Sequence, residues 1–255
     1  GLDPVGALIM LAGIYYGAQY GGSTTSILVN IPGEATSVVT CLDGHEMAKQ
    51  GRAGIALGIA AIGSFIAGSI ATVIIAAAAK PLTTLALLFG PADYFALMVL
   101  GLMFAVVLAR GSVPKAIAMI LFGILLSTVG TDIETCEERL TFGWMEIADG
   151  IDFAVIAMGM FGFAEILRNL EHKEARAVVS GRIGRLLPNL DDFKTSLAPI
   201  LRGTAIGSVL GFLHGNGAVL GPFASYSVEK RVAADPSRFG NGAIEGVAGP
   251  ESANN

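Results

Sequence analysis

The chain has 255 residues, of which 53% are hydrophobic and only 15% charged, whereas soluble domains carry about 25% charged residues. This composition argues against an ordinary soluble domain. The net charge of −5 is spread over the predicted loops without a basic patch, so we expect no nucleic acid partner. The sequence predicts an all-α fold, a polytopic transmembrane helical bundle in a lipid bilayer.

Apolar segments follow one another along the whole chain. The clearest is 53–79, which has no charged residue over 27 positions, more than the about 20 that a helix needs to cross the hydrocarbon core. The other candidate spans, which bring the total to six or seven, are 2–20, 82–109, 114–130, 151–167 and 197–228. Glycines spaced by four, such as Gly203 and Gly207, suit helices that pack closely in lipid.

The charges of the intervening loops predict an orientation, because Lys and Arg collect on the cytoplasmic side. The predicted cytoplasmic loops carry Lys49 and Arg52, Arg110 and Lys115, and the basic residues of 168–196. The acidic loop 131–150 is predicted to be external. Lys80, in a predicted turn before Pro81, is a basic residue on the external side that does not fit this pattern.

A polar stretch, 21–41, separates the first two apolar segments. We expect Gly21 and Gly22 to break the first helix and Ile31-Pro32-Gly33 to break it again. Non-helical backbone at membrane depth is tolerated only where protein or a water-filled cavity covers it. The hydroxyl and amide side chains that could coordinate a small cation or donate to a carboxylate are Ser23, Thr24, Thr25, Ser26 and Asn30. The alternative is an ordinary loop with helix caps.

Charged residues follow at once in "DGHEMAK". The segment lacks the second histidine of a zinc protease motif, because Lys49 occupies that position. Asp43 is a candidate gating or coupling residue, and the alternative is that this segment is the charged cytoplasmic end of a hairpin. Cys41 and Cys136 predict neither a disulfide nor a metal site.

A second polar stretch interrupts the apolar segment near the end of the chain. We expect one break at His214-Gly215-Asn216-Gly217 and another at Gly221-Pro222. His214 could carry a proton or cap a turn. The final "NGAIEGVAGPESANN" repeats the same mixture of glycine, proline, serine and asparagine. Two polar segments interrupted by Gly and Pro are typical of a transporter site built between structural repeats.

Two long motifs, "YYGAQYGGSTTSILVNIPGEATSVVTCLDGHEMAKQGRAGIALGIAAIGSF" and "GNGAVLGPFASYSVEKRVAADPSRFGNGAIEGVAGPESANN", resemble the large permease subunit of the tripartite tricarboxylate transporters, the TctA family. The similarity runs over nearly the whole chain. It implies a multi-pass protein of the bacterial inner (cytoplasmic) membrane, about twice this length and built from two related halves. By this resemblance, residues 1–196 would form the first repeat without its N-terminal part, 197–255 would begin the second, and 168–196 would be a cytoplasmic loop.

The resemblance also implies a function. A small membrane subunit and a periplasmic solute-binding protein would be partners, and the substrate would be citrate or a related small carboxylate. Transport would be secondary and ion-driven, a symport with sodium or protons, without another cofactor and without enzymatic activity.

The motif residues carried over as candidates for substrate or ion binding are Gly22, Ser23, Thr24, Thr25, Asn30, Pro32, Gly33, Pro250, Glu251, Ser252, Asn254 and Asn255. Glu251 suits a cation or proton better than a carboxylate substrate, because like charges repel at close range.

Two other classes of function stay open at this point. The chain could be a non-transporting membrane scaffold or assembly subunit. It could also be an intramembrane enzyme that uses His214 or the cluster of Asp43, His45 and Glu46, although the polar stretches contain few titratable residues.

Overall fold

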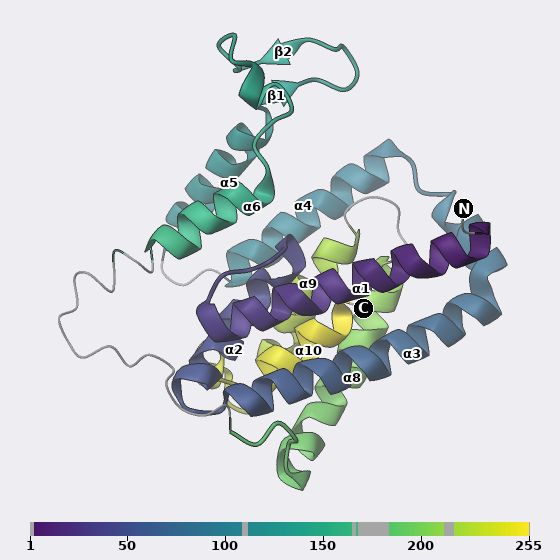
Figure 1. The fold of residues 1–255 in the computed structure, drawn as a ribbon, viewed down its shortest axis with the longest axis vertical. Coiled ribbons are helices and arrows are strands. Elements are labelled where there is room, and N and C mark those ends of the chain that lie inside the picture. The colour runs from purple at the N-terminus through teal and green to yellow at the C-terminus, as the bar shows by residue number, and fades with distance from the viewer. Residues whose placement is uncertain (1–2, 109–111, 165–166, 168–183, 212–216, 255) are drawn as a thin grey trace.

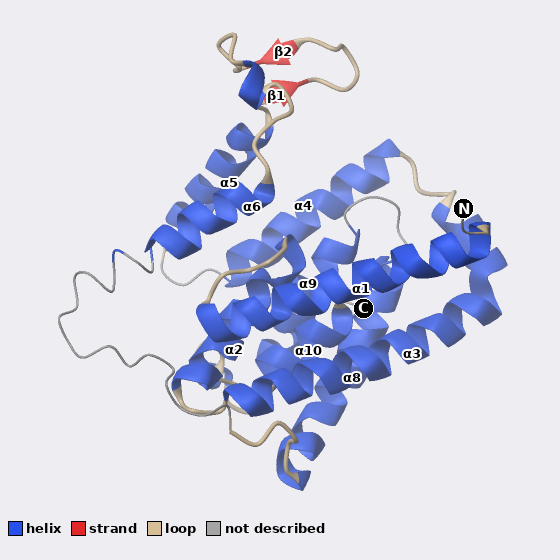
Figure 2. Cartoon of the chain, viewed as in Figure 1, coloured by secondary structure: helices blue, strands red, loops and turns tan. Residues whose placement is uncertain are grey.

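A computed structural model of the chain describes residues 3–108, 112–164, 167, 184–211 and 217–254. In these ranges the chain is almost entirely helical, which confirms the all-α prediction (Figure 2). The first helices are α1 (Pro4–Val29), the short 3-10 helix η1 (Ala35–Ser37), α2 (Val38–Lys49), α3 (Ala53–Ala86), α4 (Pro91–Leu108) and α5 (Val113–Ser127). The remaining elements are β1 (Gly130–Thr131), β2 (Glu138–Arg139), η2 (Met145–Ile147), α6 (Phe153–Ala157), the π-helix η3 (Met158–Phe163), α8 (Leu190–Gly211), α9 (Gly217–Val232), η4 (Pro236–Arg238) and α10 (Glu245–Ala253).

The short helix α10 lies inside a body made by α1, α2, α3, α8 and α9 (Figure 1). All of its residues from Gly246 to Ala253 are buried. Helix α10 packs most extensively on α8, then on α9, α3 and α2. The apolar core of the body is formed by Ile27, Met47, Ala48, Ala53, Ala56, Leu57, Ile59, Ala60, Ile200, Ile244, Val247 and Ala248.

Glycines explain why α8 and α9 can approach α10 so closely. A Cβ atom added at Gly203 would collide with the carbonyl oxygen of Gly249, and one added at Gly207 would collide with that of Ala253. At Gly221 of α9 the added atom would lie 2.7 Å from the same Ala253 oxygen. The predicted close packing through glycine is therefore confirmed at these positions.

A second part of the chain extends away from the body as an arm formed by α5, the β1–β2 ribbon and α6 (Figure 1). The two strands pair antiparallel, with Gly130 opposite Arg139 and Thr131 opposite Glu138. Helix α5 has no buried residue, and most of its large apolar side chains are exposed. The ribbon and the loop after it expose Ile133, Phe142 and Trp144.

One stretch in the described ranges, Ala53–Ala78 of α3, is a helix long and apolar enough to cross a membrane. Its mean hydropathy is 2.2, and only 28% of its most apolar window is buried. Most of this apolar surface therefore faces outward, unlike that of a core helix in a soluble protein. Shorter apolar helices cover Pro91–Val106 and Val113–Ser127. The predicted number of six or seven spans stays a prediction.

The expected break at Gly21 and Gly22 is wrong, because α1 continues without interruption from Pro4 to Val29. Each hydroxyl of the polar run bonds a carbonyl oxygen within its own helix: Ser23 to Gln19, Thr24 to Tyr20, and Thr25 and Ser26 both to Gly22. Such internal bonds satisfy these hydroxyl groups without ending the helix. The second expected break is present, since α1 ends just before Asn30.

Three other expected boundaries are also corrected. Helix α3 continues through Lys80 and Pro81 to Ala86, so Lys80 lies in a helix and not in a turn. Gly221 and Pro222 lie inside α9, where Pro222 is fully buried and Gly221 admits α10. Helix α8 begins at Leu190, within the segment predicted to be a loop. The predicted break at His214-Gly215-Asn216-Gly217 falls mainly outside the described residues.

Candidate functional site

The turn after α1 folds back over the end of that helix. Asn30 has a left-handed backbone conformation (φ 59°), and its N–H donates to the carbonyl oxygen of Thr25. Pro32 is buried, and Gly33 approaches so closely that an added Cβ atom would collide with the Cα atom of Gly22. These residues of the first motif therefore shape the backbone.

The amide of Gln19 connects three separate segments of the chain. Its Oε1 atom accepts a hydrogen bond from the Thr36 hydroxyl at 3.0 Å and from Asn254 Nδ2 at 3.1 Å. Gln19 belongs to α1, Thr36 to η1, and Asn254 follows the last turn of α10. The first and last polar motifs of the sequence thus meet at one oxygen atom.

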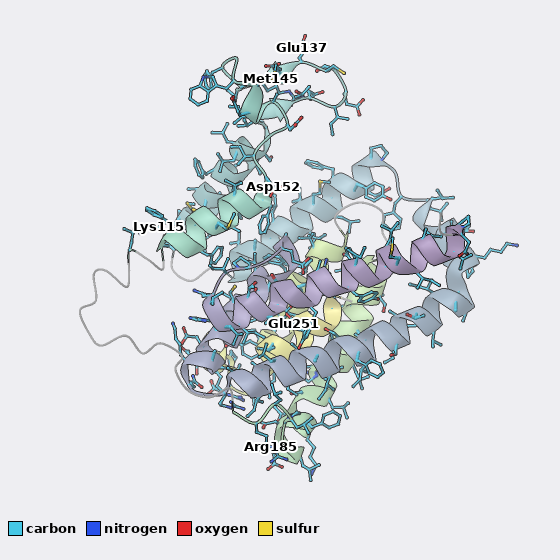
Figure 3. The ribbon with its side chains drawn as sticks, viewed as in Figure 1. Lys115, Glu137, Met145, Asp152, Arg185 and Glu251 are labelled. Atoms are coloured by element: carbon cyan, nitrogen blue, oxygen red, sulfur yellow. The ribbon has the colours of Figure 1, made fainter. Side chains whose placement is uncertain are left out.

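Glu251 is buried in the middle of the body, with 2% of its surface exposed (Figure 3). The Thr40 hydroxyl of α2 donates a short hydrogen bond to its Oε1 atom, and the Ser23 hydroxyl of α1 also lies within hydrogen-bonding reach of the carboxyl group. The carboxyl group of Glu34 is close enough to repel that of Glu251. Glu34 leads into η1 and lies over Gly22.

A cavity of about 520 Å³ opens beside these polar groups. Helices α1, α3 and α10 form its wall. The lining residues are Tyr16, Gln19, Tyr20, Ser23, Ser64, Phe65, Gly68, Ser69, Thr72, Glu251 and Asn254. Hydroxyl and amide groups dominate its polar surface, with Glu251 the one charged residue of this lining. A carboxylate-bearing molecule entering here would meet neutral donors and a buried acidic group.

A second cavity of about 490 Å³ adjoins the first and shares Tyr16, Gln19 and Asn254 with it. Its other lining residues are mostly apolar, including Ile74, Ile75 and Val209. The Gln19–Asn254 hydrogen bond joins two residues that line both cavities.

The cavity contains three of the predicted site residues: Ser23, Glu251 and Asn254. The others lie around it or elsewhere. Thr24 is partly buried on α1 and Thr25 is exposed there, whereas Pro250 and Ser252 are buried in α10. An atom added at Gly63 of α3 would lie 2.8 Å from the Ser252 hydroxyl oxygen. His214 and Asn255 lie outside the described residues.

The polar face of α3 was not predicted. Ser64, Gly68 and Thr72 follow one another at intervals of four, and with Ser69 they all line the cavity. This spacing places them on one side of a helix. Polar residues repeated on one face of an apolar span would have been the signal, because such residues face the bundle interior or a water-filled cavity.

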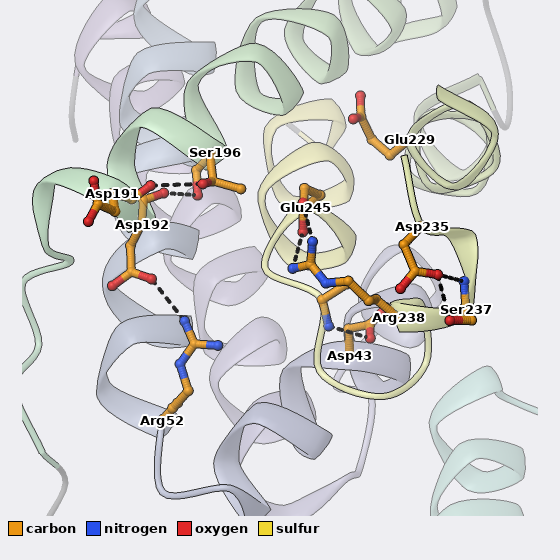
Figure 4. Close-up of polar contacts among 12 residues, drawn as sticks. Asp43, Arg52, Asp191, Asp192, Ser196, Glu229, Asp235, Ser237, Arg238 and Glu245 are labelled. Carbon is orange, nitrogen blue, oxygen red and sulfur yellow. Dashed lines mark hydrogen bonds and ion pairs between the residues drawn. The ribbon is translucent and has the colours of Figure 1, made fainter. Parts of the chain in front are cut away.

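Asp43 holds the loop that leads into α10. Its Oδ1 atom accepts from the backbone N–H groups of Gly240, Gly242 and Ala243 at 2.7, 2.8 and 2.9 Å, and its Oδ2 atom accepts from the Tyr226 hydroxyl at 2.8 Å. Figure 4 includes Asp43 beside this loop. Asp43 lies outside the cavity lining, and a gating or coupling role for it stays a prediction.

Ion pairs and a cap fix the same region from outside (Figure 4). Arg238 binds Glu245 at the start of α10 with distances of 3.1 and 3.2 Å. Asp235 accepts hydrogen bonds from the N–H and the hydroxyl of Ser237, which lowers the pKa of the Asp235 carboxyl group. The loop before α10 is therefore held at both ends.

Of the residues considered for an enzyme, Asp43, His45 and Glu46 lie in the described ranges, and each has different partners. Nδ1 of His45 lies 3.1 Å from the carbonyl oxygen of Ile27, and Glu46 pairs with Lys49 at the surface. In the ranges that the structure describes, no group of three or more His, Cys, Asp and Glu residues could hold a metal ion.

Comparison with known proteins identifies the family. Over residues 1–255 the chain matches the model described as Tripartite tricarboxylate transporter TctA family. It is 58% identical over 253 residues to an uncharacterized 52.8 kDa protein of Agrobacterium vitis, from the TAR-I ttuC' 3' region, and this match covers 99% of the chain and 50% of the relative. A second A. vitis protein, from the TAR-II ttuC' 3' region and also uncharacterized, is 69% identical over 49 residues, covering 19% of the chain and 20% of that relative.

The chain therefore spans half the length of the first relative. No solved structure matches it. The match of the family model along all 255 residues shows that the chain belongs to the tripartite tricarboxylate transporter TctA family.

Proposed function

We propose that the chain is part of a permease that carries small carboxylates, tricarboxylates among them, across the bacterial inner membrane in symport with a cation. The observation that carries this proposal is the cavity between α1, α3 and α10 and the polar groups that line part of it. Ser23 of the first motif lines this cavity together with Glu251 and Asn254 of the last motif. A site between two such segments is the arrangement expected of a secondary transporter.

Outward-facing apolar surface supports the polytopic, multi-pass membrane location. Helix α3 is long enough to span the bilayer, and α4 and α5 expose apolar side chains such as Phe95 and Leu121. Lipid would cover these surfaces, which water would not stabilise. Phe142 and Trp144 are also exposed, as expected of aromatic residues at a membrane interface.

The positions of the basic loops support the proposed orientation. Arg52, at the start of α3, forms a 2.9 Å ion pair with Asp192 at the start of α8 (Figure 4). The backbone carbonyls of Gly184 and Arg185 also pack against Gly54 of α3. Two loops assigned to the cytoplasm thus lie together, while Lys80, just beyond the apolar stretch Ala53–Ala78, is still the basic residue that does not fit this orientation.

The family includes tripartite transporters, so we propose a small membrane subunit and a periplasmic binding protein as partners. The binding protein would deliver the carboxylate, and the cavity would pass it on. The side-chain amides of Gln19 and Asn254 are the donors that could hold it, because the hydroxyl groups of Ser69 and Thr72 already donate within α3. Citrate is the first substrate to test.

Filling the cavity tests the proposal directly. Gly68 lines the cavity, and an atom added there makes only ordinary contact, 3.6 Å from the Tyr16 hydroxyl oxygen. In the full-length protein with its partners, Gly68→Leu should abolish citrate uptake by occupying the cavity while leaving insertion intact. The matched control is Gly13→Leu on α1, where nothing lies within 4 Å.

Uptake should be measured with labelled citrate and related carboxylates, with and without the binding protein, under a sodium or a proton gradient. Normal uptake by Gly68→Leu would contradict the assignment of the cavity. A wild-type protein that assembles with its partners but transports no carboxylate in the panel would favour the scaffold alternative.

A further inference from the structure

We propose that one alkali-metal cation, of which sodium is the first candidate, binds beside the cavity, between Glu251 and Asn254 of its lining and the neighbouring carboxyl group of Glu34. This inference rests on the proposed transport function, because it names the residues that would bind the coupling ion.

Unsatisfied oxygen atoms are the first observation that carries it. Among the described residues, Glu34 Oε1 and Asn254 Oδ1 are buried and have no hydrogen-bond partner. Buried acceptors without partners are costly, and a buried group that lacks one needs an explanation. The amide oxygen of Asn254 can only accept, and so can Glu34 Oε1 while its carboxyl group is ionised, so a cation would satisfy both atoms directly.

Both atoms belong to the network around Glu251. Asn254 donates through its Nδ2 atom to Gln19, whose oxygen also accepts from Thr36, and the Thr36 hydroxyl lies within hydrogen-bonding reach of the Glu34 carboxyl group. Glu34 is near enough to Glu251 to repel it. The unsatisfied oxygens therefore lie at the ends of one short chain of contacts and not at unrelated places.

The charges around the site are the second observation. Two carboxyl groups approach each other, and none of the residues that line the cavity is a lysine or an arginine. Arg202 of the neighbouring α8 donates through Nε and Nη2 to the two carboxyl oxygens of Glu229, at 2.7 and 2.5 Å. Its charge is therefore already paired. A cation between Glu34 and Glu251 would relieve their repulsion, as a bridging positive charge does.

The chemistry of the ligands selects the kind of ion. Every group named here offers oxygen, which suits hard cations rather than zinc or copper. Divalent calcium usually takes six to eight oxygen ligands, several of them carboxylates, whereas this network contains two carboxyl groups. A monovalent ion matches the smaller set.

The same ion would link substrate binding to the gradient. Without it, a carboxylate in the cavity would face the negative charge of Glu251. With it, the cation shields that charge, so each ligand raises the affinity for the other by the same factor. The dependence of carboxylate transport on the cation then follows from the electrostatic interaction between the cation, Glu251 and the bound carboxylate.

Direct cation binding tests the inference independently of transport. Purified full-length protein in detergent is titrated with ²²Na⁺ at constant ionic strength without carboxylate, and potassium, lithium and calcium serve as competitors. We expect saturable sodium binding by the wild type, weakened at least about tenfold by Glu251→Gln and about three- to tenfold by Glu34→Gln, each a loss of one charged ligand.

Glu46→Gln is the matched control, because Glu46 is a partly exposed carboxylate of α2 that pairs with Lys49 and not with any residue of the proposed cation site. Its sodium affinity should equal that of the wild type. Asn254→Ala provides a neutral variant that removes one ligand oxygen and should weaken binding about threefold. Gel filtration verifies that each variant is folded.

Three binding results would overturn the inference: no saturable sodium binding by the wild type, unchanged binding in both glutamate variants, or calcium binding in place of sodium. A fourth result, citrate uptake driven by a proton gradient alone, would reject the cation site while leaving the permease proposal intact. Loss of all carboxylate uptake with sodium binding preserved would instead reject the permease.

Discussion

The body around α10 and the arm formed by α5, the ribbon and α6 both use apolar helices, but they bury them very differently. In the body, Gly203 and Gly207 let α8 contact the backbone of α10. In the arm, Gly123 of α5 has nothing within 4 Å, and the helix buries no residue. Apolar composition alone therefore does not decide packing: small residues that face a partner bring helices together, and the arm presents its apolar surface outward.

Enlarging a glycine in each region should give the largest contrast. Gly207→Val would place its side chain into the carbonyl oxygen of Ala253, so we expect the folded protein to be lost, a cost of about 3 kcal/mol or more. Gly123→Val in the arm should change stability by less than about 1 kcal/mol, since glycine is itself a poor helix former. Fluorescence-detected gel filtration and thermal unfolding in detergent would measure both, and equal losses would refute this explanation of the packing.

Removing a carboxylate that binds backbone N–H groups should give the next largest contrast. Asp43→Ala leaves three buried N–H groups of the loop before α10 without their acceptor, so we expect a loss of about 3 kcal/mol. Asp132 in the arm accepts from the N–H groups of Glu134 and Thr135 at 2.9 and 2.8 Å, but these lie at the surface. Water can replace it, so Asp132→Ala should cost about 1 kcal/mol or less.

The same thermal unfolding measurement separates these two variants. A loss in Asp43→Ala no larger than that in Asp132→Ala would show that the loop before α10 does not depend on Asp43 for its stability. A large loss of stability in Asp43→Ala, with a smaller loss in Asp43→Asn, would agree with the role of Asp43 as a hydrogen-bond acceptor.

Breaking one ion pair in each region should give the smallest contrast. Glu229 of α9 is 2% exposed and is bound by Arg202, so Arg202→Met leaves a buried carboxylate unpaired and should cost about 2 kcal/mol, less than a fully buried pair because the arginine is partly exposed. Arg139 pairs with Asp132 in the exposed ribbon, and Arg139→Met should cost less than about 1 kcal/mol. Adding salt should reduce the second difference more than the first, and the opposite salt dependence would contradict the assignment of burial.

The sequence was sufficient to predict a helical fold and the pairing of two distant polar motifs. Ser23, Glu251 and Asn254 were all selected from these motifs, and the structure brings them to one cavity. This was possible because apolar periodicity and Gly/Pro interruptions are local features. That residues of the two motifs would contribute to one site was inferred from the resemblance of both motifs to one transporter family.

Other features depend on contacts that no local pattern reveals. The continuity of α1 depends on hydroxyl groups that bond backwards within the helix, and the same residues are equally common at helix breaks. Gln19 lies at the edge of the quoted motif, and its role appears only when Thr36 and Asn254 are placed beside it. The partners of Asp43 lie about 200 positions away along the chain.

The contact between Gly22 and Gly33 constrains how this sequence can diverge. Any side chain at Gly33 meets the Gly22 backbone, and an atom added at Gly22 would lie 3.0 Å from Glu34 Oε1. A substitution at Gly33 must therefore displace the turn that leads to Glu34, whereas one at Gly22 requires only the Glu34 side chain to shift. Distant homologues that keep Gly33 should keep this folded-back turn, whereas those that have lost it should enter η1 along a different route, so Gly33 can serve as a marker for sorting the family.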